Sequence, residues 1–256
     1  MTVPVPVVDA PDVLVAVPAR DEEDAIEACL AAVVAALEVA RTTGRVARVR
    51  VAVAAHRCRD ATAERARTLL RASGLEHVVV DDERSSTVGE VRSALVRAAL
   101  RTAPGLEVDR TWLLSTDADT VVGPDWVTGL LDVAARTGAD LVAGFVALDG
   151  WRPDRHAAAA YDEILQAGLT AEGHRHVWAA NLAVSAAAFE AAGGFPSVVH
   201  GEERVLAEHV AAAGGLVVGS LSPVVMTSAR MPGRAAHGLG DLLRRLSADD
   251  GVAEAS

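Results

Sequence analysis

Four short apolar runs, each followed by a segment with helical periodicity, restrict this chain to an α/β fold. The runs lie in residues 13–17, 46–54, 77–80 and 112–114, with Arg48, Arg50 and His77 as the polar exceptions. Consecutive apolar residues without polar alternation are typical of strands that are buried on both faces, as parallel strands are. Because strands that alternate with helices pair through right-handed crossovers, residues 13–137 are expected to form a doubly wound, mostly parallel sheet flanked by helices.

The second half of the chain follows a less regular order. Its expected elements, separated by longer loops, are a strand at 139–148, a helix at 155–170, an extended segment at 177–184, a helix at 202–213 and a short strand at 216–219. This change predicts that residues 138–240 add a mixed half, which completes a cleft over the first half. The 256 residues are therefore expected to form a single domain, with a disordered tail at 248–256.

Composition argues against several classes of protein. Hydrophobic residues make up 51% of the chain, enough for a large core, and the net charge of -11 argues against nucleic acid or an anionic membrane surface as the main partner. No run approaches 18 apolar residues, and no basic segment followed by an apolar run opens the chain. We therefore expect a cytoplasmic protein without a membrane span. Cys29 and Cys58 lack metal-binding spacing and are expected to be free thiols.

The fourth apolar run ends in two aspartates. Asp117 and Asp119 stand one residue apart beyond the strand expected at 112–114. The carboxyl ends of strands are where open α/β sheets bind ligands, and paired carboxylates can hold a hard divalent cation such as Mn²⁺ or Mg²⁺. The motif therefore predicts a metal site whose coordination is completed by water and substrate phosphates. The alternative interpretation is a strand-to-helix turn that is rich in Asp because Asp caps helices.

Three further motifs accompany the paired aspartates in a fixed order. They are PARDEE at 18–23, CRDAT at 58–62, and GGF followed by GEERVL between 193 and 206. Together the four motifs resemble those of a family 2 glycosyltransferase, a member of the nucleotide-diphospho-sugar transferase superfamily with the GT-A fold, over residues 13–235. The resemblance implies a GT-A-type, Rossmann-like sheet whose first half binds the nucleotide sugar and whose mixed second half faces the acceptor.

The resemblance also implies an activity and its partners. It points to a metal-dependent hexosyltransferase that moves one sugar from a UDP- or GDP-sugar to a hydroxyl of a small-molecule or glycan acceptor, with inversion. Mn²⁺ or Mg²⁺ is the implied cofactor, and a homodimer is compatible with this class. The implied donor-side residues are Pro18, Arg20 and Glu22 at the nucleoside, Gly89, Arg92 and Arg230 at the phosphates, and Asp119, Asp117 and His237 at the metal. Asp117 is alternatively a contact of the nucleotide ribose.

A general base must take the proton from the acceptor hydroxyl as it attacks. By family position this base is Glu203, with Glu202 beside it, although first-turn acids also occur simply because they complement a helix dipole. The chain departs from the family here, because Asp is usual at position 203. It departs again at 54–57, where many members have an Asp that reads the base, so the base of the donor is left open.

Two other functions fit part of the pattern. Read alone, the segment 113–122 resembles the first motif of haloacid-dehalogenase-type phosphohydrolases, with Asp117 as nucleophile and Asp119 as acid/base. That motif normally opens its domain, and the later Lys of that class is impossible in a chain without lysine. The second alternative is a catalytically silent protein that binds a nucleotide sugar, which the altered second strand and Glu203 keep open.

Overall fold

The computed structural model describes residues 10–102, 105–231, 233 and 238–248. The strands are β1 (Asp12–Ala19), β2 (Val49–His56), β3 (Glu76–Asp82), β4 (Thr111–Ser115), β5 (Thr120–Val121), β6 (Leu141–Asp149), β7 (Leu169–Thr170), β8 (Gly173–His174), β9 (Leu182–Ser185) and β10 (Val217–Ser228). The helices are α1 (Ile26–Thr42), α2 (Thr62–Ser73), α3 (Val88–Thr102), α4 (Trp126–Thr137), α5 (Arg155–Gly168), α6 (Ala186–Ala191), α7 (Glu202–Ala212) and α8 (Leu239–Ala248), with single 3-10 turns at Val108–Arg110 and Ala179–Asn181.

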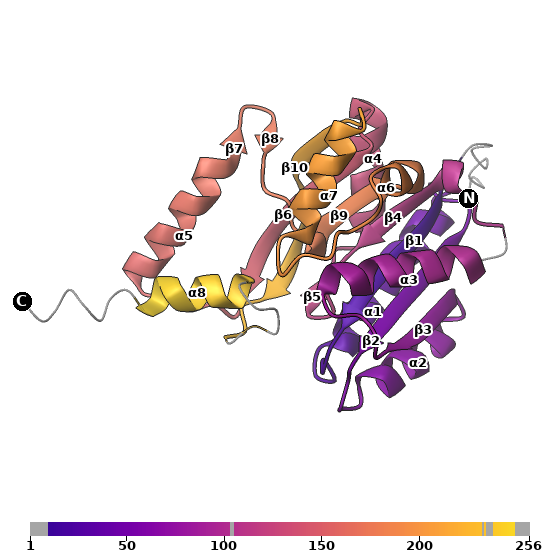
Figure 1. Cartoon of the computed structure of the whole chain (residues 1–256), viewed down its shortest axis with the longest axis horizontal. Coiled ribbons are helices and arrows are strands. Elements are labelled where there is room, and N and C mark those ends of the chain that lie inside the picture. The colour runs from indigo at the N-terminus through magenta and orange to yellow at the C-terminus, as the bar shows by residue number, and fades with distance from the viewer. Residues whose placement is uncertain (1–9, 103–104, 232, 234–237, 249–256) are drawn as a thin grey trace, which may run out of the picture.

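An eight-stranded sheet in the order β3-β2-β1-β4-β9-β6-β10-β5 runs through the described residues (Figure 1). β1 pairs in parallel with β2 and β4, and β2 pairs in parallel with β3. β9 lies antiparallel between β4 and β6, and β10 runs parallel to β6. The expected α/β class, with a mostly parallel first half and a mixed second half, is therefore confirmed.

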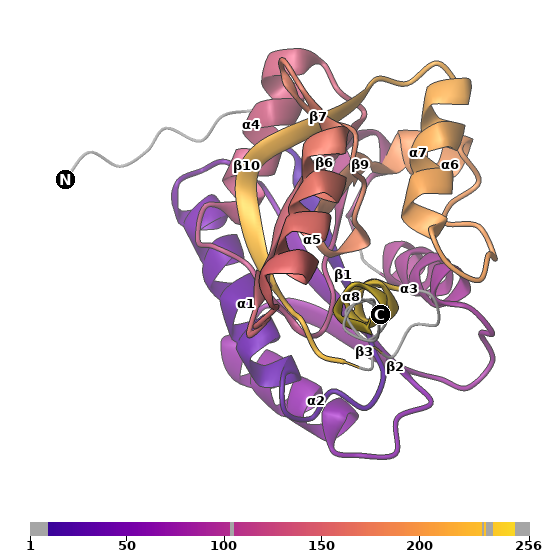
Figure 2. The same ribbon diagram turned by 90° about the vertical axis from the view of Figure 1, so that its left-hand side faces the viewer.

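Helices cover the sheet on both faces because each presents one apolar stripe to it. One core cluster joins α1, α2 and α4 to one face, with Trp126 fully buried at its centre. The other cluster joins α3, α6 and α7 to the opposite face around Phe189. α5 packs against α8 to one side of the sheet, as the two figures agree (Figures 1 and 2). None of the described helices combines the length and apolarity needed to cross a membrane.

The element that differs most in length from its expected bounds is β10. The sequence predicts a strand at 216–219 only, whereas β10 continues to Ser228 through an irregularity between Gly219 and Val224. The strand bends across the sheet (Figure 2), and its last residues pair antiparallel with β5. The segment 220–223 reads as a turn because Ser and Pro are frequent in turns, which hides the bulged strand. The bend is what brings the end of β10 to the paired aspartates.

Candidate active site

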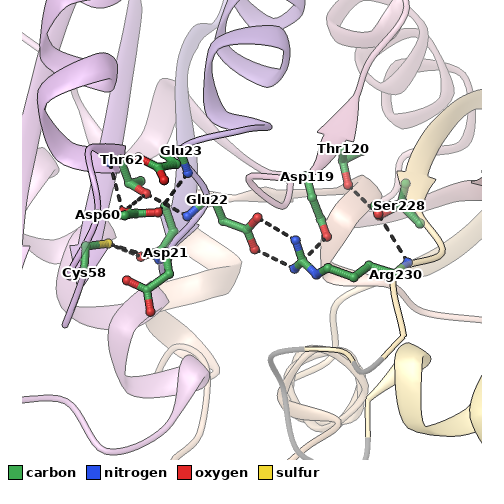
Figure 3. A network of polar contacts seen from close by, with 12 residues as sticks. Asp21, Glu22, Glu23, Cys58, Asp60, Thr62, Asp119, Thr120, Ser228 and Arg230 are labelled. Carbon is green, nitrogen blue, oxygen red and sulfur yellow. Dashed lines mark hydrogen bonds and ion pairs between the residues drawn. The ribbon is translucent and has the colours of Figure 1, made fainter.

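The turns after β1 and β2 are fastened to each other by hydrogen bonds. The backbone N–H of Glu22 donates to the Thr62 hydroxyl at 2.7 Å, and that of Glu23 donates to an Asp60 carboxylate oxygen at 3.1 Å (Figure 3). Asp60 also accepts from the backbone N–H of Thr62, the first residue of α2, at 3.0 Å. These bonds fix the turn that follows β1. The Glu22 side chain is buried and points away from these bonds, toward Arg230.

Arg230, two residues beyond β10, bridges two carboxylates from distant parts of the chain. Its guanidinium donates to both oxygens of Glu22, at 2.9 and 2.7 Å, and approaches Asp119 at 3.4 Å (Figure 3). The end of β10 is held beside Asp119 by the Ser228 N–H, which donates to the Asp119 carbonyl at 3.2 Å, and by a bond between Thr120 and Thr227. The geometry thus joins the β1 turn, the paired aspartates and the end of β10 in one site.

A second guanidinium organises the other side of the site. Arg92, on α3, is buried, and it donates to the Ser115 hydroxyl at 2.5 Å and to the Asp117 carboxylate. Its Nε lies 3.4 Å from an Glu202 carboxylate oxygen at the start of α7. Arg92 is therefore a buried cation that pairs with both Asp117 and Glu202.

Two carboxylates of the site have raised pKa values, first because they are buried and then because other carboxylates lie close to them. The pKa of Asp119 is raised to about 6, first by burial and then by Asp117 and Glu22, against the lowering effect of Arg230. The pKa of Glu203 is raised to about 7, first by burial and then by its neighbour Glu202. A divalent cation would relieve the repulsion at Asp119, and a carboxylate that titrates near neutrality is suited to accept a proton.

Gly89 allows α3 to approach the loop before α7. A Cβ at this position would collide with the backbone oxygen of Pro196 and crowd the Cβ of Glu202. Gly89→Ala is expected to lower the free energy of unfolding by about 1–3 kcal/mol, because the backbone of that loop must move. Thermal or urea unfolding measures the change. Gly123→Ala is the control, since its Cβ meets only the flexible end of Asp125; equal stability of the two variants would refute the packing role of Gly89.

The structure brings most of the residues expected at the site together. Glu22, Arg230, Asp119, Asp117, Arg92 and Glu202 form a continuous chain of ion pairs or sequence neighbours. Pro18 is the last but one residue of β1, where it pairs with Ala54, and Arg20 is exposed in the turn that follows the strand. Their assigned roles stay predictions. His237 lies outside the described residues.

Several contributors to the site carry no signal of their own in the sequence. The Ser115 hydroxyl accepts from Arg92, and the Cys29 thiol donates to the Asp117 carbonyl at 3.3 Å. Ser115 ends an apolar strand two residues before Asp117, and this position could have identified it as a site residue. Cys29 gives no such signal, because it fits the apolar pattern of α1. Asn181 is fully buried in the core, where it accepts from the Trp126 indole at 2.9 Å.

The sequence matches one known protein family over its first part. The family described as "Glycosyl transferase family 2" matches residues 14–160. No curated protein sequence matches the chain.

Solved structures share the fold at low sequence identity. A Pyrobaculum calidifontis mannosyltransferase in complex with GDP-Man and Mn²⁺ is similar with a TM-score of 0.63 and 20% identity, over 90% of this chain and 60% of that one. S. aureus TarS 1-349 with UDP-GlcNAc gives 0.61 and 15%, over 92% and 65%. Mycobacterium tuberculosis glucosyl-3-phosphoglycerate synthase with Mn²⁺ and UDP-Glc gives 0.53 and 21%, over 92% and 76%. The chain thus spans less than two thirds of the length of the first two.

Proposed function

Because the chain belongs to glycosyltransferase family 2, we propose that it transfers one hexose from a UDP- or GDP-sugar to an acceptor hydroxyl, with a divalent metal and with inversion at the anomeric carbon. The observation that supports this most is that Arg92 pairs with both Asp117 and Glu202, the neighbour of Glu203, while Arg230 approaches Asp119. In this proposal residues 13–137 bind the donor and residues 138–240 face the acceptor within one domain.

The donor set at the paired aspartates fits a hard divalent cation. Carboxylate oxygens are the ligands that Mn²⁺ and Mg²⁺ accept. The pKa of Asp119 is raised first by burial and then by the charges of Asp117 and Glu22, which a bound cation would offset. Asp119 would hold the cation directly, and Asp117 directly or through water. When bound, such an ion neutralises the charge that gathers on the leaving diphosphate. The solved relatives named above with Mn²⁺ support a divalent metal here, and do not decide between Mn²⁺ and Mg²⁺.

Arg230 is positioned to bind the donor diphosphate. Glu22 holds its guanidinium by two hydrogen bonds, which keeps the side chain next to Asp119 without saturating its five donors. Glu22 therefore serves the diphosphate indirectly, in addition to the contact with the nucleoside that the family resemblance suggests. A fixed cation beside the metal aspartate would stabilise the same negative charge as the metal does.

The role proposed for Arg230 predicts a loss of affinity on its removal. Arg230→Gln is expected to weaken binding of UDP or GDP about tenfold, which corresponds to one charge-assisted hydrogen bond, and to weaken binding of uridine or guanosine little. Calorimetry with the nucleoside and its diphosphate measures both. Arg244→Gln, an exposed arginine on α8, is the matched control. If nucleoside and diphosphate lose the same affinity, Arg230 does not contact the phosphates.

Glu203 is the proposed general base. It stands in the first turn of α7, and Arg92 pairs with its neighbour Glu202 at 3.4 Å, so Glu203 is left as the carboxylate of the pair that can gain a proton near neutrality. In an inverting displacement the acceptor oxygen bonds to the anomeric carbon while the bond to the diphosphate oxygen breaks. The hydroxyl proton passes to Glu203, and the nucleoside diphosphate leaves.

Release of nucleoside diphosphate tests the proposal without knowledge of the acceptor. UDP- and GDP-hexoses are incubated with the protein and Mn²⁺, with water as the default acceptor and with candidate alcohols added. We expect one donor to release its diphosphate, and EDTA to stop the release. Metal-dependent binding without any release, with every acceptor offered, would instead favour the silent nucleotide-sugar binder.

A further inference from the structure

Aliphatic side chains are exposed on β5, the strand that directly follows Asp119, and on β10, which pairs with it. Val224 and Met226 of β10 are 44% and 42% exposed, and Val121 of β5 is 45% exposed. Met226 is directly opposite Val121 in the β5–β10 pair and opposite Ala147 in the β6–β10 pair, while Val224 is opposite Phe145. We call these five residues the apolar strip.

The strip lies on one face of the sheet. Successive side chains of a strand point to opposite faces. The alternate residues Val225, Thr227 and Thr120 are buried, and Val225 belongs to the core cluster that contains α1 and α4. Val224, Met226 and Val121 must therefore point to the opposite face. Three strands at about 4.8 Å spacing make the strip about 10 Å wide, and the three positions 224–226 of β10 make it about 10 Å long.

One end of the strip reaches the candidate metal site. Asp119 is two residues before Val121, and Ser228, two residues after Met226, is fastened to Asp119 by its backbone N–H. Ser228 is opposite Asp149 on β6, so polar and acidic groups replace aliphatic ones at this end. At the other end Phe145 contacts the rings of His174 and Trp178 edge-on, each with 5.4 Å between ring centroids. The strip is thus an aliphatic surface that is bounded by aromatic rings at one end and by the candidate metal site at the other.

The chemistry of the strip favours one class of ligand. Valine and methionine side chains offer no hydrogen bonds to the hydroxyls of a sugar, and their exposure to water has a cost that a hydrocarbon removes when it covers them. The strip itself carries no charged side chain, so it offers no partner to a carboxylate or phosphate group in the body of the acceptor.

We propose that the acceptor is an apolar alcohol, whose hydrocarbon body covers the apolar strip and whose hydroxyl lies at the Asp119 end. This rests on the proposed transferase function and gives it a substrate class. The alcohol oxygen forms the bond to the anomeric carbon of the donor sugar, the bond from that carbon to the diphosphate oxygen breaks, and the hydroxyl proton goes to Glu203. The product is a glycoside with an apolar aglycone and a free nucleoside diphosphate.

Met226 offers a direct reporter of the strip. The chain has three methionines, Met1, Met226 and Met231, so ¹³C-methyl methionine labelling gives few resonances, and Met226→Leu and Met231→Leu assign them. The probes are n-octyl β-D-glucoside and methyl β-D-glucoside, which share the sugar and differ in seven methylenes, and n-octanol. We expect n-octanol and the octyl glucoside to shift the Met226 methyl saturably, with an affinity at least tenfold above that of the methyl glucoside, since each buried methylene adds to affinity.

Val224→Ser, an exposed position, is expected to weaken octanol binding about threefold or more while the protein stays folded. Val39→Ser, an exposed position on α1, is the matched control.

Equal shifts of Met226 by the methyl and octyl glucosides, or no shift by octanol, would overturn the proposal. A Met226 shift that depends on protein concentration without any probe would instead show that a second copy covers the strip, and would also overturn it. Because this readout needs neither donor nor turnover, its failure would leave the transferase proposal standing, and failure of donor release would leave the octanol site measurable.

Discussion

Asp119→Asn is expected to reduce release of nucleoside diphosphate from the donor sugar by about a thousandfold, the size of effect seen when a main electrostatic stabiliser of a transition state is lost. The carboxylate is the proposed direct ligand of the divalent cation, and the amide removes its charge while keeping its shape. Arg230 would lose a partner as well, since it approaches Asp119 at 3.4 Å. Initial rates with saturating Mn²⁺ and the preferred donor measure the effect.

Asp162→Asn is the matched control for this change. It removes the same charge from an exposed position on α5, and its rate is expected to equal that of the unmodified protein. A thermal melt of both variants checks that each is folded. A folded Asp119→Asn protein that retains more than about a tenth of the rate would contradict the assignment of Asp119 to the metal.

Glu203→Gln is expected to reduce the rate of transfer to an alcohol by about a hundredfold to ten-thousandfold, the usual contribution of a general base, with little change in nucleotide affinity. The raised pKa of Glu203, about 7, adds a dependence on pH. A base acts in its deprotonated form, so the rate should fall as the pH drops below about 7 and level off above it. A pH profile of kcat/KM at constant metal measures this, and Glu203→Gln should remove the acidic limb.

Glu208→Gln, an exposed change on the same helix, is the control and should keep both the rate and the profile. If Glu203→Gln retains the acidic limb, another group is the base, and Glu202 is then the first residue to test. If instead nucleotide affinity falls in parallel with the rate, the change has disturbed Arg92 through the pair of glutamates, and the assignment of Glu203 as base fails.

The first half of the fold could be predicted from the sequence because its signals are local. Strands buried on both faces read as continuous apolar runs, and the helices between them show one apolar stripe. Local signals also placed the paired aspartates just after β4, since that strand ends at Ser115, two residues before Asp117. The resemblance to family 2 glycosyltransferases, which joined four such local motifs, is confirmed by the family match, and the phosphohydrolase alternative is set aside with it.

The rest of the site depends on contacts between distant parts of the chain. Glu22 and Arg230 are 208 positions apart, and no property of either residue alone indicates the pair. Arg92 could be expected at the donor phosphates from its family position, but only the packing of α3 against α7 shows that it is buried between Asp117 and Glu202. The apolar strip also escaped prediction, because Met226 and Val121 become neighbours only through the bend of β10.

Calorimetry of UDP and GDP tests the central claim most directly, because it needs neither the sugar nor the acceptor. Each nucleotide is titrated into the protein with Mn²⁺ and again with EDTA, and the tighter one is repeated with Asp119→Asn. The account predicts that one nucleotide binds with micromolar affinity, and that both EDTA and the Asn variant abolish this binding. Absence of binding by both nucleotides with Mn²⁺, or binding that is unchanged by EDTA, would contradict a metal-dependent nucleotide-sugar site at the paired aspartates.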